Sequence, residues 1–126
     1  MSINKNYAVF GLGRYGRAVA KELVDNGAEV IVVDSDSKTV EEFSGDFPIC
    51  KCADVTEQEA IKRLGISNID VVVIAITDSF ETSVMATMLC KEAGVKQVIV
   101  KCSDELHRTI LEKVGADMVV LPEKES

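Results

Sequence analysis

The chain has too few basic residues to bind nucleic acid or an anionic membrane through its overall charge. Its 126 residues include 14 Lys and Arg against 21 Asp and Glu, which gives a net charge of −7 at neutral pH. Binding to nucleic acid requires a basic patch that neutralises phosphates, and docking on anionic lipid requires a similar cluster. We therefore expect no nucleic-acid partner. Any anionic ligand must be attracted locally, against an unfavourable overall field.

The sequence also lacks long apolar runs and targeting signals. It contains no apolar run of about 20 residues, the length that a helix needs to cross a bilayer, and no N-terminal signal sequence. We therefore expect a cytoplasmic protein without direct membrane insertion. A peripheral location at the inner membrane would come through a partner protein.

Histidine is scarce, and the cysteines do not show a metal-binding spacing. The one histidine, His107, shares a predicted apolar helix face with Ile110 and Leu111, which favours packing over catalysis. A zinc site is poorly supported, because no C-x-x-C pair accompanies this single histidine. We expect reduced thiols that act as small hydrophobic side chains at Cys50, Cys52, Cys90 and Cys102. We expect that the protein is not an enzyme.

A glycine motif near the start of the chain is the strongest functional signal. An apolar run at 7–10 leads into Gly-Leu-Gly-Arg-Tyr-Gly at 11–16, where the first predicted helix begins. In this pattern Gly11 permits a tight turn, Gly13 lets the backbone approach a pyrophosphate, and Gly16 allows close packing of helix on strand. Amides at the helix N-terminus attract phosphate. The motif predicts nucleotide binding; the alternative is a turn that only packs a helix on a sheet.

An acid at the end of the second apolar run completes the motif. Asp34 follows Gly16 by 18 residues and is placed to accept hydrogen bonds from ribose hydroxyls. Ser35, a further candidate contact, and Asp36 come directly after it. Two acids at this point would repel a 2′-phosphate, so NADP(H) is disfavoured. We expect ATP or ADP as the ligand, with NAD(H) or AMP as alternatives.

Apolar runs and helical patterns alternate along the chain and predict a parallel sheet covered on both faces. The runs lie at 7–10, 30–33, 48–52, 71–76, 98–100 and 118–121. Helical patterns lie between them at 14–26, 37–43, 57–64, 80–93 and 104–114, with Thr56, Ser79 and Ser103 as expected N-caps. This alternation is typical of a doubly wound, Rossmann-like α/β fold. We expect a single domain over residues 1–126, six parallel strands in the order 3-2-1-4-5-6, and a ligand crevice between strands one and four.

Residues around this crevice supply further candidate contacts to the ligand. Asp54 and Val55 follow the third run, where Asp54 could accept from the adenine amine and Val55 could pack on the ring. The alternative for Asp54 is capping of the next helix. Ala75, Ile76 and Thr77 end the fourth run, opposite the glycine motif. Small residues there let the ligand lie close, and Thr77 could hydrogen-bond ribose or phosphate.

Charged residues are candidates for the phosphate end of the ligand. Arg14, inside the glycine motif beside Tyr15, could direct its guanidinium to phosphate oxygens; otherwise it is a solvated helix arginine. Lys101 ends the fifth run on the same rim and could help to hold a polyphosphate, unless it is simply exposed. Glu123 belongs to an acidic tail. It could reach a triphosphate only through a bridging metal ion such as Mg²⁺, since carboxylate and phosphate repel each other.

Large apolar side chains also recur at helical spacing in the fourth helical pattern. Met85, Met88 and Leu89 form this stripe. We expect it to pack in the core, as amphipathic helix faces do. The alternative is that part of the stripe forms a subunit interface, because methionine suits both settings.

Several stretches together resemble the N-terminal nucleotide-binding domain of the RCK (TrkA-N) family of potassium-conductance regulators. They are Gly-Leu-Gly-Arg-Tyr-Gly at 11–16, Val-Val-Asp at 32–34, Ala-Asp-Val-Thr at 53–56, Leu-Gly-Ile at 64–66, Leu-Glu-Lys-Val-Gly-Ala-Asp at 111–117 and Pro-Glu-Lys at 122–124. The resemblance covers essentially the whole chain and is greatest to the cytosolic gating subunits of bacterial Ktr/Trk-type potassium transporters. Many dehydrogenases share the glycine motif, whereas Arg14 and the late stretches are more specific.

The resemblance implies a regulatory subunit on the inner face of a membrane potassium channel or transporter. Such domains bind ATP, ADP or NAD(H), and they self-associate as dimers and as an octameric ring in the full-length protein. The resemblance implies that the three glycines bind phosphate and Asp34 binds ribose. It matches Arg14 to a phosphate-facing arginine, and it places Lys101 and Glu123 near the terminal phosphate and the subunit boundary. We expect this chain to be the N-terminal part of such a protein, without the C-terminal regulatory domain.

The main alternative is the cofactor domain of an NAD-dependent oxidoreductase, which shares the glycine motif. Hydride transfer usually needs an acid–base residue beside the nicotinamide, and only His107 offers itself. A binding module of some other enzyme or transporter is a further alternative. The sequence favours a nucleotide-sensing module over both.

Overall fold

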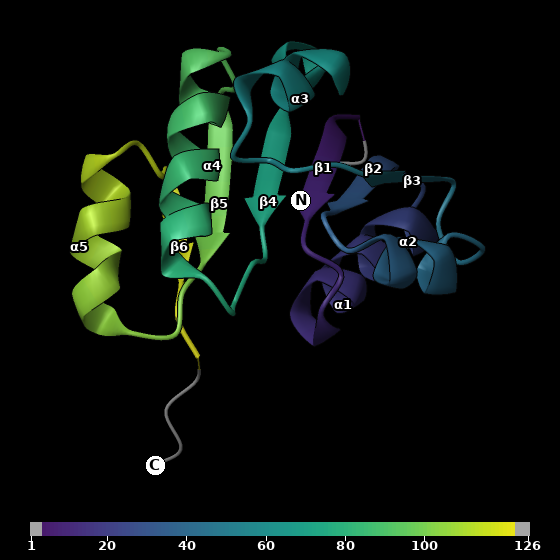
Figure 1. Cartoon of the computed structure of the whole chain (residues 1–126), viewed down its shortest axis with the longest axis horizontal. Coiled ribbons are helices and arrows are strands. Elements are labelled where there is room, and N and C mark those ends of the chain that lie inside the picture. The colour runs from purple at the N-terminus through teal and green to yellow at the C-terminus, as the bar shows by residue number, and fades with distance from the viewer. Residues whose placement is uncertain (1–3, 123–126) are drawn as a thin grey trace.

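The computed structural model describes residues 4–122, which form one sheet with helices on both faces (Figure 1). The strands are β1 (Asn6–Phe10), β2 (Glu29–Asp34), β3 (Ile49–Cys52), β4 (Val71–Ile74), β5 (Gln97–Lys101) and β6 (Met118–Val120). The helices are α1 (Arg14–Asp25), α2 (Ser37–Phe43), α3 (Gln58–Arg63), α4 (Phe80–Glu92) and α5 (Glu105–Lys113), with a 3₁₀ turn η1 at Ile66–Asn68. Among these residues, no helix combines the length and apolarity that a membrane span requires.

The sheet has the strand order β3-β2-β1-β4-β5-β6, and each neighbouring pair is parallel. This confirms the Rossmann-like arrangement that the alternation of apolar runs and helices predicts. The order reverses between β1 and β4, which lie side by side with Phe10 opposite Ile74. At this point the chain leaves the two strands toward opposite faces, and ligands of such sheets bind in the crevice between them.

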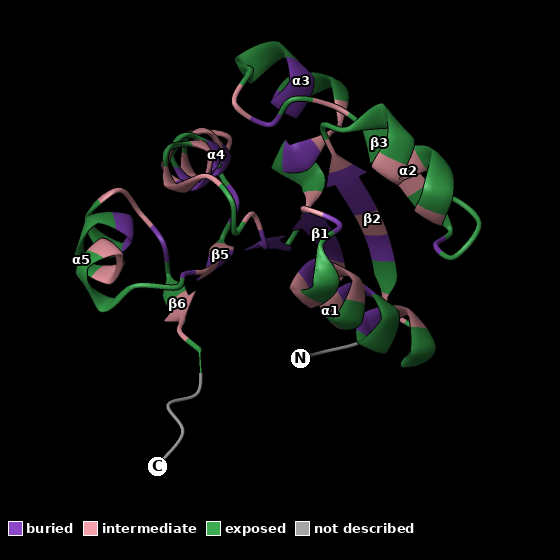
Figure 2. Cartoon of the chain, turned by 60° about the horizontal axis from the view of Figure 1, so that its bottom comes forward, coloured by how far each residue is buried: buried purple, intermediate pink, exposed green. Residues whose placement is uncertain are grey.

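Each face of the sheet has its own buried cluster. Tyr7 and Val9 of β1 belong to the cluster under α1 and α2, whereas Ala8 and Phe10 belong to the cluster under α3, α4 and α5. All four side chains are at most 1% exposed, as expected for a strand that is covered on both faces. Figure 2 shows the buried residues concentrated in the strands and on the sides of the helices that face them.

Two helices begin later than predicted because aspartates organise the turns before them. Asp104 caps α5, and its carboxylate accepts a hydrogen bond from the amide two residues on at 2.8 Å, so the prediction of Ser103 as the cap is wrong. Before α3, Asp54 accepts hydrogen bonds from the amide and the hydroxyl of Thr56 at 2.9 and 2.6 Å. Thr56 is therefore used in a turn of its own, and α3 begins only at Gln58.

The helix α4 buries its small side chains and exposes large ones. Its buried positions are Ser83, Ala86, Thr87 and Cys90. By contrast, Met85 and Met88 are each 39% exposed, so the prediction that the methionine stripe packs in the core is wrong for these two residues. Burial raises the pKa of the Cys90 thiol to about 12, which keeps it protonated and unreactive.

The late Gly-Ala-Asp stretch has a structural role at the start of β5. One carboxylate oxygen of Asp117 accepts hydrogen bonds from the Val98 amide at 2.7 Å and from the Lys91 ammonium at 3.0 Å. Lys91 also donates to the Val95 carbonyl at 3.1 Å. Gly115 has a φ of +122°, and a Cβ there would lie only 2.7 Å from Cγ of Lys91. This stretch therefore connects the end of α4, the start of β5 and the loop before β6 through direct contacts.

Candidate nucleotide-binding site

A cleft of about 830 Å³ opens at the carboxyl ends of β1 to β4. Its walls are the loops that follow these strands, together with α2 and the first turns of α1 and α4. Of the residues that the sequence singles out, the cleft is lined by Gly11, Gly13, Asp34, Ser35, Asp54, Val55, Ala75, Ile76 and Thr77. The fold thus brings residues from four separate segments to the switch point of the sheet.

The glycine motif is packed so closely that two of its positions exclude any side chain. Gly11 has a φ of +100°, and a Cβ on it would lie 2.6 Å from the carbonyl oxygen of Ala75. A Cβ on Gly16 would overlap the carbonyl oxygen of Gly11. The Gly11 amide donates to the Val33 carbonyl at 2.8 Å, which connects the loop to β2. The start of α1 is therefore held directly against β1, β2 and β4.

The glycine loop that leads into α1 presents its backbone to the cleft. The helix begins at Arg14, and no described side chain caps the preceding Gly13. A Cβ built on Gly13 meets no described atom within 4 Å, so the backbone there is open to a ligand. Uncapped amides at a helix N-terminus, together with the helix dipole, stabilise a bound phosphate.

Asp34 connects the glycine loop to the loop before α2. One of its carboxylate oxygens accepts a hydrogen bond from the Leu12 amide at 2.8 Å, and the other accepts one from the Asp36 amide at 2.9 Å. An ionised carboxylate has about four lone-pair positions, so each oxygen keeps capacity for a ribose hydroxyl. Asp34 is thus suited both to fix two walls of the cleft and to bind ribose between them.

Asp54 lies on the wall of the cleft that follows β3. Its hydrogen bond from the Thr56 hydroxyl, and a second one from the Thr56 amide, hold the pKa of this carboxyl below its usual range. The neighbouring Val55 lines the cleft and is 6% exposed. The arrangement pairs an ionised acceptor with an apolar surface, as recognition of a base would require.

The wall that follows β4 is tied to the first turn of α4. Ser79 is the N-cap, and its hydroxyl accepts a hydrogen bond from the Thr82 amide at 3.2 Å. Ser83 donates to the Ile76 carbonyl at 3.0 Å. The loop between β4 and α4, including Thr77, is therefore held in place by side chains of α4 itself.

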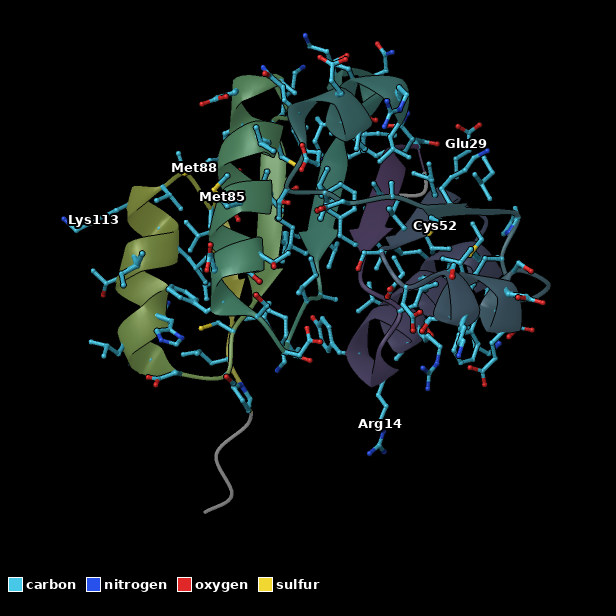
Figure 3. The ribbon with its side chains drawn as sticks, in the orientation of Figure 1. Arg14, Glu29, Cys52, Met85, Met88 and Lys113 are labelled. Carbon is cyan, nitrogen blue, oxygen red and sulfur yellow. The ribbon has the colours of Figure 1, made fainter. Side chains whose placement is uncertain are left out.

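Five of the expected contacts do not line the cleft. Gly16 packs beneath the glycine loop, as described above. The Lys101 ammonium lies 5.1 Å from the centre of the Tyr15 ring, and burial raises the pKa of Tyr15; neither residue lines the cleft. Arg14 is exposed and points away from the domain (Figure 3). Glu123, and with it the expected metal contact, lies outside the described residues.

Helix geometry explains the position of Arg14. The buried side of α1 carries Gly16, Ala20 and Leu23. Arg14 lies two residues before Gly16, which places it about 200° around the helix from that side. Within its own chain Arg14 is therefore directed to the surroundings of the domain, where a ligand held by a neighbouring molecule could lie.

Sequence reasoning missed Arg17, which lines the cleft together with Asp36, Thr39, Phe43 and Asp78. Long side chains in a helix point back toward its N-terminus. Arg17 stands one turn into α1, so its side chain returns to the glycine loop. The spacing indicates this position, because Arg17 follows Gly13 by four residues, about one helical turn.

Acidic side chains predominate in the cleft. Its lining carboxylates are Asp34, Asp36, Glu42, Asp54 and Asp78. Against them stands Arg17, the one Lys or Arg among the described residues that line it. The backbone amides of the glycine loop and this arginine are therefore the groups of the described lining that attract an anion. Within residues 4–122, no three His, Cys, Asp or Glu side chains are grouped as metal ligands.

Comparison with known families agrees with this architecture. The sequence model of the TrkA-N domain matches residues 7–122. The chain belongs to the TrkA-N family, also called RCK. It is 41% identical over 122 residues to Ktr system potassium uptake protein A of Vibrio alginolyticus, covering 97% of this chain and 56% of that protein. It is 36% identical over 123 residues to Ktr system potassium uptake protein C of Bacillus subtilis, covering 98% and 56%. This TrkA-N domain thus spans about half the length of these relatives.

Solved structures share the fold at low sequence identity. The NAD(P)-binding domain of an exopolyphosphatase-related protein from Archaeoglobus fulgidus superposes with a TM-score of 0.83 at 24% identity, covering 93% of this chain and 87% of that one. The GsuK channel bound to NAD gives 0.82 at 14% identity, covering 92% and 21%. GsuK bound to ADP gives 0.82 at 13% identity, covering 93% and 31%.

The two hydrogen bonds of Asp34 predict a loss of stability when this side chain is removed, even without ligand. Asp34→Ala leaves the Leu12 and Asp36 amides without their acceptor, and we expect the free energy of unfolding to fall by about 1–3 kcal/mol. Urea unfolding of the ligand-free protein measures this change. Ser35→Ala, at the exposed next position, is the control and should stay within about 0.5 kcal/mol of the parent. Equal stability of Asp34→Ala and the parent would show that Asp34 serves the ligand alone.

Proposed function

We propose that this domain senses adenine nucleotides and thereby regulates a membrane potassium channel or transporter from the cytoplasmic side. The observation that carries the proposal is the cleft at the switch point, with an open glycine loop on one side and Asp34 on the other, in a TrkA-N domain. Two relatives named as Ktr potassium uptake proteins support the transport system as the partner. The domain acts as a peripheral subunit and holds no reaction chemistry of its own.

The arrangement of the cleft suggests how a nucleotide lies in it. The phosphates lie over Gly13 and the first turn of α1, where backbone amides favour an anion. Asp34 accepts hydrogen bonds from the ribose, and the base lies near Asp54 and Val55. Asp34 and Asp36 disfavour a ribose that carries a 2′-phosphate. ATP or ADP therefore fits best, with NAD(H) or AMP as alternatives.

Sensing, and not catalysis, is the role that the lining of the cleft supports. His107 stacks on Phe80 with ring centres 3.8 Å apart, and among the described residues neither ring lines the cleft. An oxidoreductase would need an acid or base positioned beside the nicotinamide. A sensor needs only a difference in affinity between two shapes of the assembly.

Arg14 is proposed to make that difference at a boundary between subunits. Its side chain points away from its own cleft (Figure 3), so it is placed to reach the terminal phosphate of a nucleotide in an adjacent molecule. Lys101 lies near this side of α1 through its contact with Tyr15. With ATP, Mg²⁺ held partly by Glu123 would bridge the terminal phosphate. The number of phosphates would then change the contacts between subunits.

Calorimetric titration with ATP, ADP, AMP, NAD and NADP tests the nucleotide proposal. We expect at least one ligand with an unphosphorylated ribose to bind, and NADP to bind at least tenfold more weakly. Saturation at about 100 times the dissociation constant should add about 2.7 kcal/mol of stability. Arg14→Ala should weaken ATP more than AMP, and Lys21→Ala, an exposed position of the same helix, should change neither. Absence of binding by all five ligands would refute the proposal.

Self-association is proposed to bury an apolar surface on the side of α4 and α5. This α4–α5 surface consists of Met85, Met88, Leu106 and Ile110, which are 39%, 39%, 74% and 43% exposed. They are four of the six large apolar residues with substantial exposure among those described. Exposed apolar patches of this kind mark interaction sites. We propose that this surface joins two copies of the chain, and that the full-length protein assembles further into an octameric ring.

Analytical ultracentrifugation at several concentrations tests this surface. Met88→Asp places a charge in the centre of the proposed contact and should shift the chain toward monomer. Ile49→Asp removes an equally exposed apolar side chain at the β3 edge and should leave the association unchanged. A parent that stays monomeric at the highest concentration, or equal effects of both substitutions, would contradict the proposal.

A further inference from the structure

Arg17 is a positively charged side chain in the cleft whose role the proposed function leaves open. It is the fourth residue of α1, and its side chain runs back along the helix to the glycine loop. Its Nη1 donates a hydrogen bond to the Leu12 carbonyl at 2.9 Å. The guanidinium therefore lies at the loop over which a phosphate would bind.

The other side of this guanidinium rests on α2. Its central carbon lies 4.3 Å from the centre of the Phe43 ring, a distance typical of a cation–π contact. Phe43 also lines the cleft. Two contacts, one with the glycine loop and one with α2, thus fix the orientation of Arg17 before any ligand arrives, so little side-chain entropy remains to be lost on binding.

Most of the hydrogen-bonding capacity of Arg17 remains available. A guanidinium has five N–H donors, and Leu12 accepts from one of its nitrogens. Asp34, Asp36 and Glu42 line the same cleft, but within the described part of the chain Arg17 forms no ion pair with them. A cation that is held beside several acids without pairing to one of them is well placed for an anionic ligand.

Because the cleft is acidic, Arg17 should contribute more to the affinity for a nucleoside phosphate than to the affinity for an uncharged nucleoside. Without it, the described lining would carry five carboxylates and no Lys or Arg. Adenosine has no charge to be repelled, whereas a phosphate group has. Loss of the arginine should therefore weaken AMP much more than adenosine.

We propose that Arg17 is a specificity-determining residue that binds the α-phosphate of the nucleotide in its own chain. This inference rests on the proposed nucleotide binding and refines it, because it separates the roles of two arginines. Arg17 binds the first phosphate within the cleft, and Arg14 serves the terminal phosphate at the subunit boundary. The competing explanation is that Arg17 only ties the glycine loop to α2.

Calorimetric titration with adenosine, AMP and ADP separates these two explanations. Arg17→Gln keeps an N–H donor for the Leu12 carbonyl but removes the charge. We expect it to weaken AMP and ADP by about 10- to 100-fold, as loss of a charge-assisted hydrogen bond does, and adenosine by less than about threefold. Arg17→Lys keeps the charge but loses the planar fork, and should weaken AMP by an intermediate amount.

The matched control is Arg63→Gln, at an exposed position at the end of α3 outside the cleft. It removes the same charge from the protein and should leave the affinities within about twofold. Ligand-free unfolding curves establish that each variant is folded. Should Arg17→Gln not fold, the ratio of AMP to adenosine affinity in Arg17→Lys decides, and an unchanged ratio overturns the proposal.

Two results would overturn the role of Arg17 while leaving nucleotide binding intact. One is an equal loss of adenosine and AMP affinity in Arg17→Gln, which identifies a structural tie. The other is an unchanged AMP affinity in a folded Arg17→Gln. A parent that binds neither AMP nor ADP would refute this inference, and a parent that binds none of ATP, ADP, AMP, NAD and NADP would refute the proposed function as well.

Discussion

The close packing of the glycine loop against the ends of β1 and β4 is the constraint on which the cleft depends. A side chain at Gly11 would meet the Ala75 carbonyl, and one at Gly16 would overlap the Gly11 carbonyl. Since neither position tolerates a Cβ, the N-terminus of α1 lies directly over the switch point of the sheet. Its uncapped amides face the crevice between β1 and β4, where the strand order reverses. The other residues that line the cleft lie around this glycine loop.

The groups that attract an anion at the site act locally, against the negative net charge of the whole chain. The chain has a net charge of −7, and the described lining of the cleft holds five carboxylates. The backbone amides at Gly13 and the guanidinium of Arg17 are the groups that attract an anion against this negative field. The backbone of Leu12 lies between two charged side chains. Its amide donates to Asp34, and its carbonyl accepts from Arg17. The same two side chains that shape the loop are thus the ones proposed to hold ribose and phosphate.

The sequence predicted the fold well because buried parallel strands leave a strong and local signal. The apolar runs, most of them unbroken, give the number of strands, and the helices between them imply parallel crossover connections. The strand order followed from the Rossmann arrangement that accompanies the glycine motif. Helix starts were harder to predict. A hydroxyl such as Ser103 and a neighbouring carboxylate such as Asp104 both satisfy the capping pattern, and only the backbone geometry decides between them.

Side-chain directions in the site depend on which side of each helix packs on the sheet, and the glycine motif alone does not specify this. Arg14 stands inside the glycine motif, yet the rotation of α1 turns it outward, and the same rotation brings Arg17 to the loop. In α4 the small residues face the sheet, because a helix can approach a sheet more closely through small side chains, and Met88 is left outside. A periodicity of apolar residues shows that a helix has an apolar face, but not whether that face is buried. In α4 the face that carries Met85 and Met88 is exposed.

We propose above all that a nucleotide binds at the glycine loop of this cleft. Amide-resolved NMR of the ¹⁵N-labelled chain during titration with ADP tests it most directly. We expect the largest shifts at Gly11, Gly13 and Asp36, while the amides of Ile49 at the β3 edge and Glu112 on α5 stay unchanged. Saturating ADP that leaves the glycine-loop amides unshifted, or that shifts only residues away from the cleft, would contradict the account.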